Sequence, residues 1–102
     1  MRESKVEEHL VKRVKALGGE VRKVGWIGRA NAPDRLVLFP QEKQWTLRYK
    51  DEQIVISHPF VELKRPTKGA TAAQAREHER LRAAGLVVLV LNSIEAIDEV
   101  FG

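Results

Sequence analysis

Residues 60–91 read FVELKRPTKGATAAQAREHERLRAAGLVVLVL, and this stretch predicts a strand, a helix and a second strand in succession. Residues 60–64 alternate side chains between two faces, as a half-buried strand does. A helix is expected over 72–84, with Gly85 as its C-terminal stop. Residues 86–91 are apolar on both faces, which predicts a central strand covered on both sides. Since two strands joined through one helix usually lie parallel, residues 60–64 and 86–91 should be parallel.

The other segments add elements around this unit. Residues 4–17 carry apolar side chains at helical spacing, and two glycines follow as a stop signal. The remaining predicted elements are strands over 20–27 and 35–39, a hairpin of strands 45–49 and 53–57, and a short last helix capped by Ser93 and running through Phe101. This order predicts an α/β fold with a mixed central sheet flanked by helices. We expect one domain over residues 1–102, in which residues 41–59 form an inserted hairpin.

The composition narrows the class of protein. The chain has 102 residues, of which 43% are apolar and 31% are charged, as in ordinary globular domains. It has no cysteine, which excludes disulfides, thiolate metal sites and cysteine nucleophiles. The spacing of its three histidines does not suggest zinc, and we expect His9 and His78 on solvent-facing helix surfaces. The start of the chain has no apolar signal-peptide core and no apolar run could span a membrane, so we expect a cytoplasmic protein. A net charge of +4 permits a polyanionic partner.

Two carboxylates and a lysine stand at the ends of predicted strands. Asp34 precedes strand 35–39, while Glu62 and Lys64 share one face of strand 60–64. If these strands are neighbours, Asp34 and Glu62 can converge, and a divalent cation such as Mg²⁺ would relieve their repulsion. A metal ion beside a lysine is the apparatus of phosphodiester hydrolysis. The alternatives are a surface ion pair between Glu62 and Lys64, and turn chemistry at Asp34.

A resemblance supports the hydrolytic interpretation. The residues PD at 33–34 and ELK at 62–64 match the PD-(D/E)xK nuclease pattern. The wider frame, GGEVRKVGWIGRANAPDRLVLFP at 18–40 followed by FVELKRPTKGATAAQ at 60–74, resembles the virus-type replication-repair nuclease (VRR-NUC) family in its standalone phage form. The resemblance implies a restriction-endonuclease-like core and a metal-dependent DNA endonuclease that cuts branched structures such as four-way junctions. It also implies the cytoplasm of a bacterial or phage-infected cell.

The resemblance also implies a set of site residues. Asp34 and Glu62 would bind Mg²⁺, with Mn²⁺ as a substitute, and Lys64 would be the catalytic lysine. Gln74 would be the active-site glutamine. Glu7 would be the acidic residue of the first helix, with Glu3 as the fallback. In the family, the aspartate and the Glu-x-Lys motif usually bracket one tight hairpin, whereas this chain adds residues 41–59 between them.

Two of these residues also fit a capping role. Thr71 to Gln74 reads TAAQ, a capping box in which Gln74 would reach back to the Thr71 backbone. Ser4 to Glu7 reads SKVE, which is a second capping box. The sequence alone leaves the structural and the catalytic interpretations of Gln74 and Glu7 open.

Four residues near the motif are candidates for DNA contact. Trp26 and Arg29 lie in the segment before Asp34, where they would suit base stacking and phosphate contact. Trp26 could equally belong to the core. Arg65 and Lys68 flank the Glu-x-Lys motif and would contact the DNA backbone.

The partners follow from the size of the chain and the expected substrate. Cutting a symmetric junction on two strands needs two active sites, so a homodimer or a larger homo-oligomer is expected. Two other classes remain open: a non-catalytic DNA-binding module on the same fold, and a structural partner protein whose acidic and basic face is only an ion-pair network. A DNA-binding module would bind branched DNA without cutting it in any divalent ion. A structural partner would bind neither metal nor DNA.

Overall fold

The computed structural model describes residues 3–40, 45–49, 52–56, 58–65 and 68–102. Along these residues the elements are α1 (Glu3–Ala16), β1 (Glu20–Lys23), β2 (Arg35–Leu38), β3 (Trp45–Tyr49), β4 (Glu52–Ile56), β5 (Phe60–Leu63), α2 (Ala72–Ala83), β6 (Val88–Leu91) and α3 (Ile94–Phe101). This order of helices and strands is the one expected from the hydrophobic periodicities.

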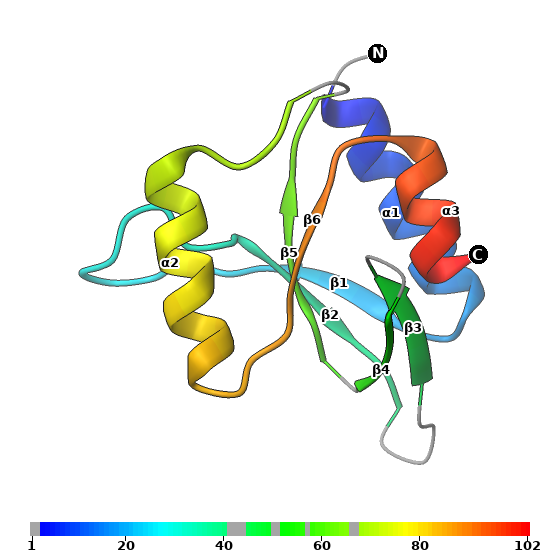
Figure 1. Ribbon diagram of the computed structural model, residues 1–102. Helices are drawn as coiled ribbons and strands as arrows, with labels where there is room; N and C mark the ends of the chain where they lie inside the picture. The colour runs from blue at the N-terminus through cyan, green and yellow to red at the C-terminus, as the bar shows by residue number, and fades with distance from the viewer. Residues whose placement is uncertain (1–2, 41–44, 50–51, 57, 66–67) are drawn as a thin grey trace.

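Four strands form one mixed sheet in the order β1-β2-β5-β6. The pairs β1–β2 and β2–β5 are antiparallel, whereas β5 and β6 lie parallel. Helix α2 covers one face of the sheet, and α1 and α3 pack together on the other face (Figure 1). The expected α/β architecture is therefore confirmed, as is the parallel pairing predicted for the stretch that begins at FVELK.

The inserted segment contains the expected hairpin. β3 and β4 pair antiparallel, from Trp45 opposite Ile56 to Tyr49 opposite Glu52, and form a separate two-stranded sheet. Strand β3 lies against α3, and among the described residues neither hairpin strand pairs with the four-stranded sheet that carries the motif. Residues 41–44, 50–51 and 57 of the expected insertion lie outside the described residues.

Two expectations about strands are corrected. The segment 86–91 was expected to form a central strand, but β6 is the outermost strand of the four-stranded sheet. Its residues are apolar because helices cover both faces of the sheet. An edge strand can be covered on both faces in this way, although it has a neighbouring strand on one side only. The strand expected over 20–27 ends at Lys23. Beyond it, Val24 still donates a backbone hydrogen bond to the Asp34 carbonyl (2.9 Å), and the chain then leaves the sheet.

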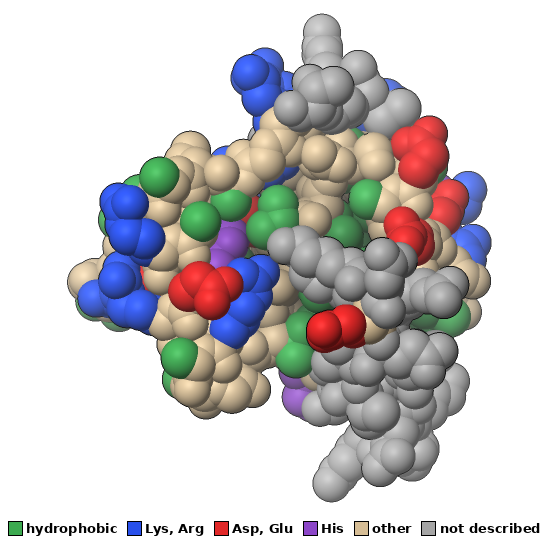
Figure 2. Space-filling model, in the orientation of Figure 1, with side chains coloured by type: hydrophobic (Ala, Val, Ile, Leu, Met, Phe, Trp, Pro, Cys, Tyr) green, Lys and Arg blue, Asp and Glu red, His purple; other side chains and the backbone are tan. Residues whose placement is uncertain are grey.

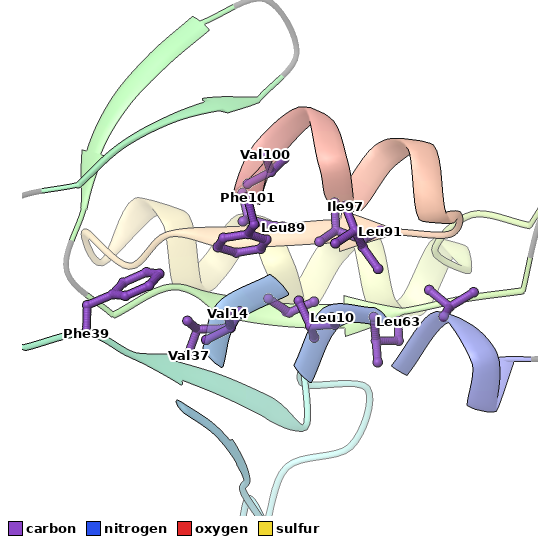
Figure 3. Close-up of a cluster of buried hydrophobic side chains, with 12 residues drawn as sticks. Leu10, Val14, Val37, Phe39, Leu63, Leu89, Leu91, Ile97, Val100 and Phe101 are labelled. Carbon is purple, nitrogen blue, oxygen red and sulfur yellow. The ribbon is translucent and has the colours of Figure 1, made fainter. Parts of the chain in front are cut away.

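The hydrophobic core lies between the sheet and the helix pair α1–α3. Val6, Leu10 and Val14 of α1 are fully buried there, whereas Val11 is exposed. The rings of Phe101 in α3 and Phe39 pack with 6.3 Å between their centroids. Figure 3 shows these side chains meeting from both helices and the sheet; the buried cluster comprises Val6, Leu10, Val14, Val37, Phe39, Val61, Leu63, Leu89, Leu91, Ile97, Val100 and Phe101. Within the described part of the chain, no helix has the length and apolarity that a membrane span requires.

The turn from α1 into β1 requires two glycines. Gly18 has a φ of 87°, a left-handed conformation that ends the helix without the strain a side chain would add. A Cβ at Gly19 would lie 2.6 Å from the carbonyl oxygen of Leu38. This close approach lets β1 begin directly opposite the end of β2, with Glu20 opposite Leu38.

Candidate active site

The sheet register sets the positions of the two candidate metal ligands on neighbouring strands. β2 and β5 pair with Arg35 opposite Val61 and Leu36 opposite Phe60. Continuing this register by one residue places Asp34 opposite Glu62. The strands are therefore neighbours, which was the condition for the two carboxylates to converge, and the convergence of the side chains stays a prediction.

Lys64 continues the same strand face as Glu62. Its backbone N–H donates to the carbonyl oxygen of Leu91 (3.0 Å), which extends the β5–β6 ladder past Leu63. The side chain of Lys64 is half-buried, and its positive charge is close enough to influence His78 on α2. Lys64 therefore lies on the face of the sheet that α2 covers, as the alternation of FVELK predicted.

The backbone around Asp34 is held on both sides. The indole Nε1 of Trp26 donates to the carbonyl oxygen of Pro33 (2.6 Å), and Val24 donates to that of Asp34. The Trp26 ring also packs on Phe60 of β5, with 5.2 Å between ring centroids. Trp26 is thus half-buried and positions the Pro-Asp segment. Base stacking by its ring stays a prediction.

A buried arginine joins Asp34 to the first helix. Arg35 contacts Asp34 Oδ1 through Nη1 (2.9 Å) and Glu7 Oε1 through Nη2 (3.1 Å). Glu7 points from α1 toward the sheet, as its place beside the apolar stripe predicted. Ser4 lies inside α1, so it is not the N-cap that the second capping box required. The structure therefore gives Glu7 a partner, Arg35, that the sequence analysis did not name.

Glu62 lies beneath α2, next to a buried histidine. Its Oε1 is 3.5 Å from Nε2 of His78, whose side chain is only 1% exposed. Burial, followed by the positive charges of Arg82 and Lys64, lowers the pKa of His78 below its ordinary value of 6.5. This shift of the His78 pKa favours the neutral imidazole beside Glu62.

The expectation that His78 faces solvent is wrong. The buried face of α1 can be located from the spacing of its apolar residues. The sequence of α2 is polar and contains few apolar residues, so the same spacing does not identify its buried face. The side chains that α2 buries are Glu77 and His78.

The buried histidine makes stability depend on pH. Because the pKa of His78 is lower in the folded protein than in the unfolded chain, the unfolded chain binds this proton first as the pH falls. The free energy of unfolding should therefore decrease below a pH of about 6.5, and His78→Gln should flatten that decrease. Urea unfolding at about pH 7.5 and 5.5 measures it, with the exposed His58→Gln as the matched control. A parent-like slope in the His78→Gln protein would contradict the assignment.

Gln74 forms the capping box. Its backbone N–H donates to Thr71 Oγ1 (3.1 Å), and its Oε1 accepts from the Thr71 N–H (2.9 Å). The structural interpretation is therefore confirmed, while a catalytic role for Gln74 stays a prediction.

The cap can be tested separately from catalysis. Thr71→Ala should lower the free energy of unfolding by about 1 kcal/mol, because it leaves the first turn of α2 without its side-chain acceptor. Gln74→Glu should stay close to the parent, since glutamate also completes the box. Urea unfolding measures both variants. A loss of cleavage in a stably folded Gln74→Glu protein would show that the amide has a role beyond the cap.

The remaining DNA-contact candidates differ in their surroundings. Arg29 is half-exposed and pairs with the nearly buried Glu77 through Nη2 (2.5 Å). This hydrogen bond, more than the opposing effect of burial, lowers the pKa of Glu77, and the same contact raises the pKa of Arg29. Arg65 and Lys68 are exposed beyond the end of β5, where the backbone of Lys68 donates to the Arg65 carbonyl (3.0 Å). All three residues are exposed, but the guanidinium of Arg29 is already held by Glu77.

The surface around α2 is rich in cations. Figure 2 shows Lys and Arg side chains gathered over this helix, with a carboxylate among them. α2 contributes three arginines to the surface, and Arg82 is restrained by donating to the Val88 carbonyl (2.8 Å). A mixed but mainly basic face beside the motif suits contact with a polyanion.

The donor set fits a hydrated Mg²⁺ ion. Among the described residues, no three His, Cys, Asp or Glu side chains group closely enough to hold a metal by themselves. Asp34 and Glu62 lie opposite each other when the β2–β5 register is continued by one residue, and both side chains offer only oxygen donors. Mg²⁺ commonly takes one or two protein carboxylates and keeps several waters, so two ligands are enough.

Comparisons with known proteins agree with the fold of the chain. No family model matches the chain. The chain is 41% identical over 93 residues to "Putative nuclease p44" of Acyrthosiphon pisum secondary endosymbiont phage 1, a match that covers 91% of the chain and 85% of that relative. A solved structure described as a VRR_NUC domain matches with a TM-score of 0.71 and 35% identity, over 94% of this chain and 89% of the other.

Proposed function

The chain belongs to the virus-type replication-repair nuclease (VRR-NUC) family, and we propose that it is a divalent-metal-dependent DNA endonuclease that cuts branched DNA such as four-way junctions. The observation that carries the proposal is the register of β2 and β5, which sets Asp34 opposite Glu62 with Lys64 on the Glu62 face. Two carboxylates and an ammonium group in this arrangement are better explained by phosphodiester hydrolysis than by a surface ion pair.

Each residue of the site has a proposed role. Asp34 and Glu62 hold the ion, and Mg²⁺ bound there would polarise a phosphoryl oxygen and lower the pKa of a water. Lys64 directs its ammonium group at the charge that develops on the scissile phosphate. Arg65 and Lys68, exposed beyond β5, neutralise neighbouring phosphates and hold the DNA strand.

The size of the chain supports action as a homodimer or larger assembly. The body of the protein measures only 32 × 32 × 27 Å, and the proposal places one active site on it. A junction cut symmetrically on two strands requires two sites, which a two-fold assembly supplies. The preference for branched DNA and the assembly are both parts of the proposal.

A cleavage panel tests the proposal. Labelled duplex, single-stranded, flap and four-way-junction DNA are incubated with Mg²⁺, Mn²⁺ or EDTA. We expect cutting of the branched substrates in either metal and none in EDTA. Glu62→Gln should lose the activity, whereas Glu8→Gln, which changes an exposed glutamate on α1, should keep it.

Each other outcome has a distinct meaning. Equal cutting of duplex and junction would contradict the structure selectivity alone. Binding without cutting in any metal would identify a DNA-binding module. If the protein neither bound nor cut DNA, the charged face would be only an ion-pair network.

A further inference from the structure

One buried guanidinium is shared by two carboxylates at the site. The Arg35 side chain is 10% exposed. Its Nη1 lies 2.9 Å from Asp34 Oδ1 and also donates to the Asp34 carbonyl (3.4 Å). Its Nη2 and Nε contact Glu7 Oε1 at 3.1 and 3.3 Å. Arg35 therefore binds the carboxylate of Asp34, a candidate metal ligand, and approaches it from the face of the sheet opposite to α2.

The three partners differ in their freedom to move. Arg35 lies on the same strand face as Val37, toward the core beneath α1, so moving its charge away from both carboxylates would be costly. Glu7 is anchored on a helix that packs on this face. Asp34, in contrast, stands before the first residue of β2 with its side chain 60% exposed. Asp34 is thus the member of the group whose carboxylate can exchange partners.

We propose that Arg35 is a positioning residue that occupies the Asp34 carboxylate in the metal-free protein and competes with the divalent ion for it. Glu7 sets the strength of this competition by binding the other side of the guanidinium. The inference rests on the proposed function, because it takes Asp34 and Glu62 as the residues that hold the ion. It gives Glu7 an indirect role through Arg35 in place of direct contact with the metal.

The competition predicts opposite effects for substitutions of Arg35 and of Glu7, its second carboxylate partner. Arg35→Gln removes the competing cation, so the Kd for Mn²⁺ should fall by about two- to fivefold, a size typical of a solvent-screened ion pair. Glu7→Gln leaves the guanidinium to Asp34 alone, so the Kd should rise by a similar factor, about two- to fivefold. Arg35→Lys keeps the charge but loses the planar fork that reaches both carboxylates, so its Kd should lie between those of the parent and Arg35→Gln.

A double-mutant cycle separates the indirect role of Glu7 from direct metal binding. If Glu7 acts through Arg35, adding Glu7→Gln to the Arg35→Gln protein should leave the Kd nearly unchanged. If Glu7 is a ligand, the same addition should weaken binding as much as it does in the parent. Glu8→Gln, on the same helix and exposed, corrects for the general loss of one negative charge.

Calorimetric titration with Mn²⁺ measures the Kd values, and thermal unfolding in EDTA and in Mn²⁺ supplies a readout without DNA. Arg35→Gln should have a lower Tm than the parent in EDTA and a larger rise on adding Mn²⁺. If Arg35→Gln does not fold, Arg35→Lys and Glu7→Gln carry the test, because the proposal predicts shifts of opposite sign for them.

The outcomes distinguish this inference from the proposed function. Parent protein that binds no Mn²⁺, or whose binding survives both Asp34→Asn and Glu62→Gln, would remove the metal site and the inference with it. Binding that depends on Asp34 and Glu62 but is equal or weaker in Arg35→Gln and Arg35→Lys would overturn only the competition. An undiminished effect of Glu7→Gln in the Arg35→Gln protein would likewise overturn it.

Discussion

Lys64→Met should lower the rate of metal-dependent DNA cleavage by about 100- to 1000-fold, the loss usual when one group that stabilises transition-state charge is removed. The expectation follows from the position of Lys64, half-buried on the same strand face as Glu62 and fixed by its backbone bond to Leu91. Methionine keeps an unbranched apolar stem, so packing along the strand should survive while the charge is lost. Single-turnover cleavage of the preferred branched substrate measures the rate of the chemical step.

Lys12→Met is the matched control, because it removes one positive charge from the exposed side of α1. It should cut within about twofold of the parent, as expected for a surface change away from the site. If both variants lost activity equally, the effect of Lys64 would be one of general charge on DNA binding. If Lys64→Met cut at the parent rate, Lys64 would not be the catalytic lysine.

Leu10→Ala should lower the free energy of unfolding by about 2–5 kcal/mol, the range for truncating a large aliphatic side chain in a packed core. Leu10 is 0% exposed and sits in the middle of the α1 stripe, against the core strands and α3. A small domain has only about 5–15 kcal/mol of total stability, so this loss is a large share of it. Urea unfolding followed by circular dichroism measures the change.

The neighbouring residue supplies the control. Val11 is 42% exposed on the same helix, so Val11→Ala removes few contacts and replaces valine with a better helix former. Its free energy of unfolding should stay within about 0.5 kcal/mol of the parent. Equal losses in the two variants would mean that α1 contributes through its helical backbone more than through the buried stripe.

The local patterns predicted the order of the elements, and they made the approach of Asp34 to Glu62 conditional on their two strands being neighbours. A strand alternates its side chains with a period of two, so FVELK alone put Glu62 and Lys64 on one face. The remaining condition was that strands β2 and β5 be neighbours, and the structure shows that they pair antiparallel.

Contacts between distant segments were not predictable in the same way. Arg35 and Glu7 are separated by 28 residues, and Arg29 and Glu77 by 48. No local periodicity links such pairs. The available signal for Arg35 was its place among inward-facing positions of RLVLF, where a buried cation requires a carboxylate partner. For His78, the polar sequence of α2 gave no comparable signal.

The sequence by itself determined the α/β class, the strand–helix–strand unit over 60–91, the hairpin and the residues of the Asp, Glu and Lys motif. These depend on side-chain periodicity and on turn and cap residues, which act over a few positions. Only the tertiary structure decided that β6 lies at the sheet edge, that His78 is buried beside Glu62, and that Arg35 joins Asp34 to Glu7. The reason is physical: strand order and the pairing of buried charges minimise the free energy of the whole packed chain, and no short segment contains both partners.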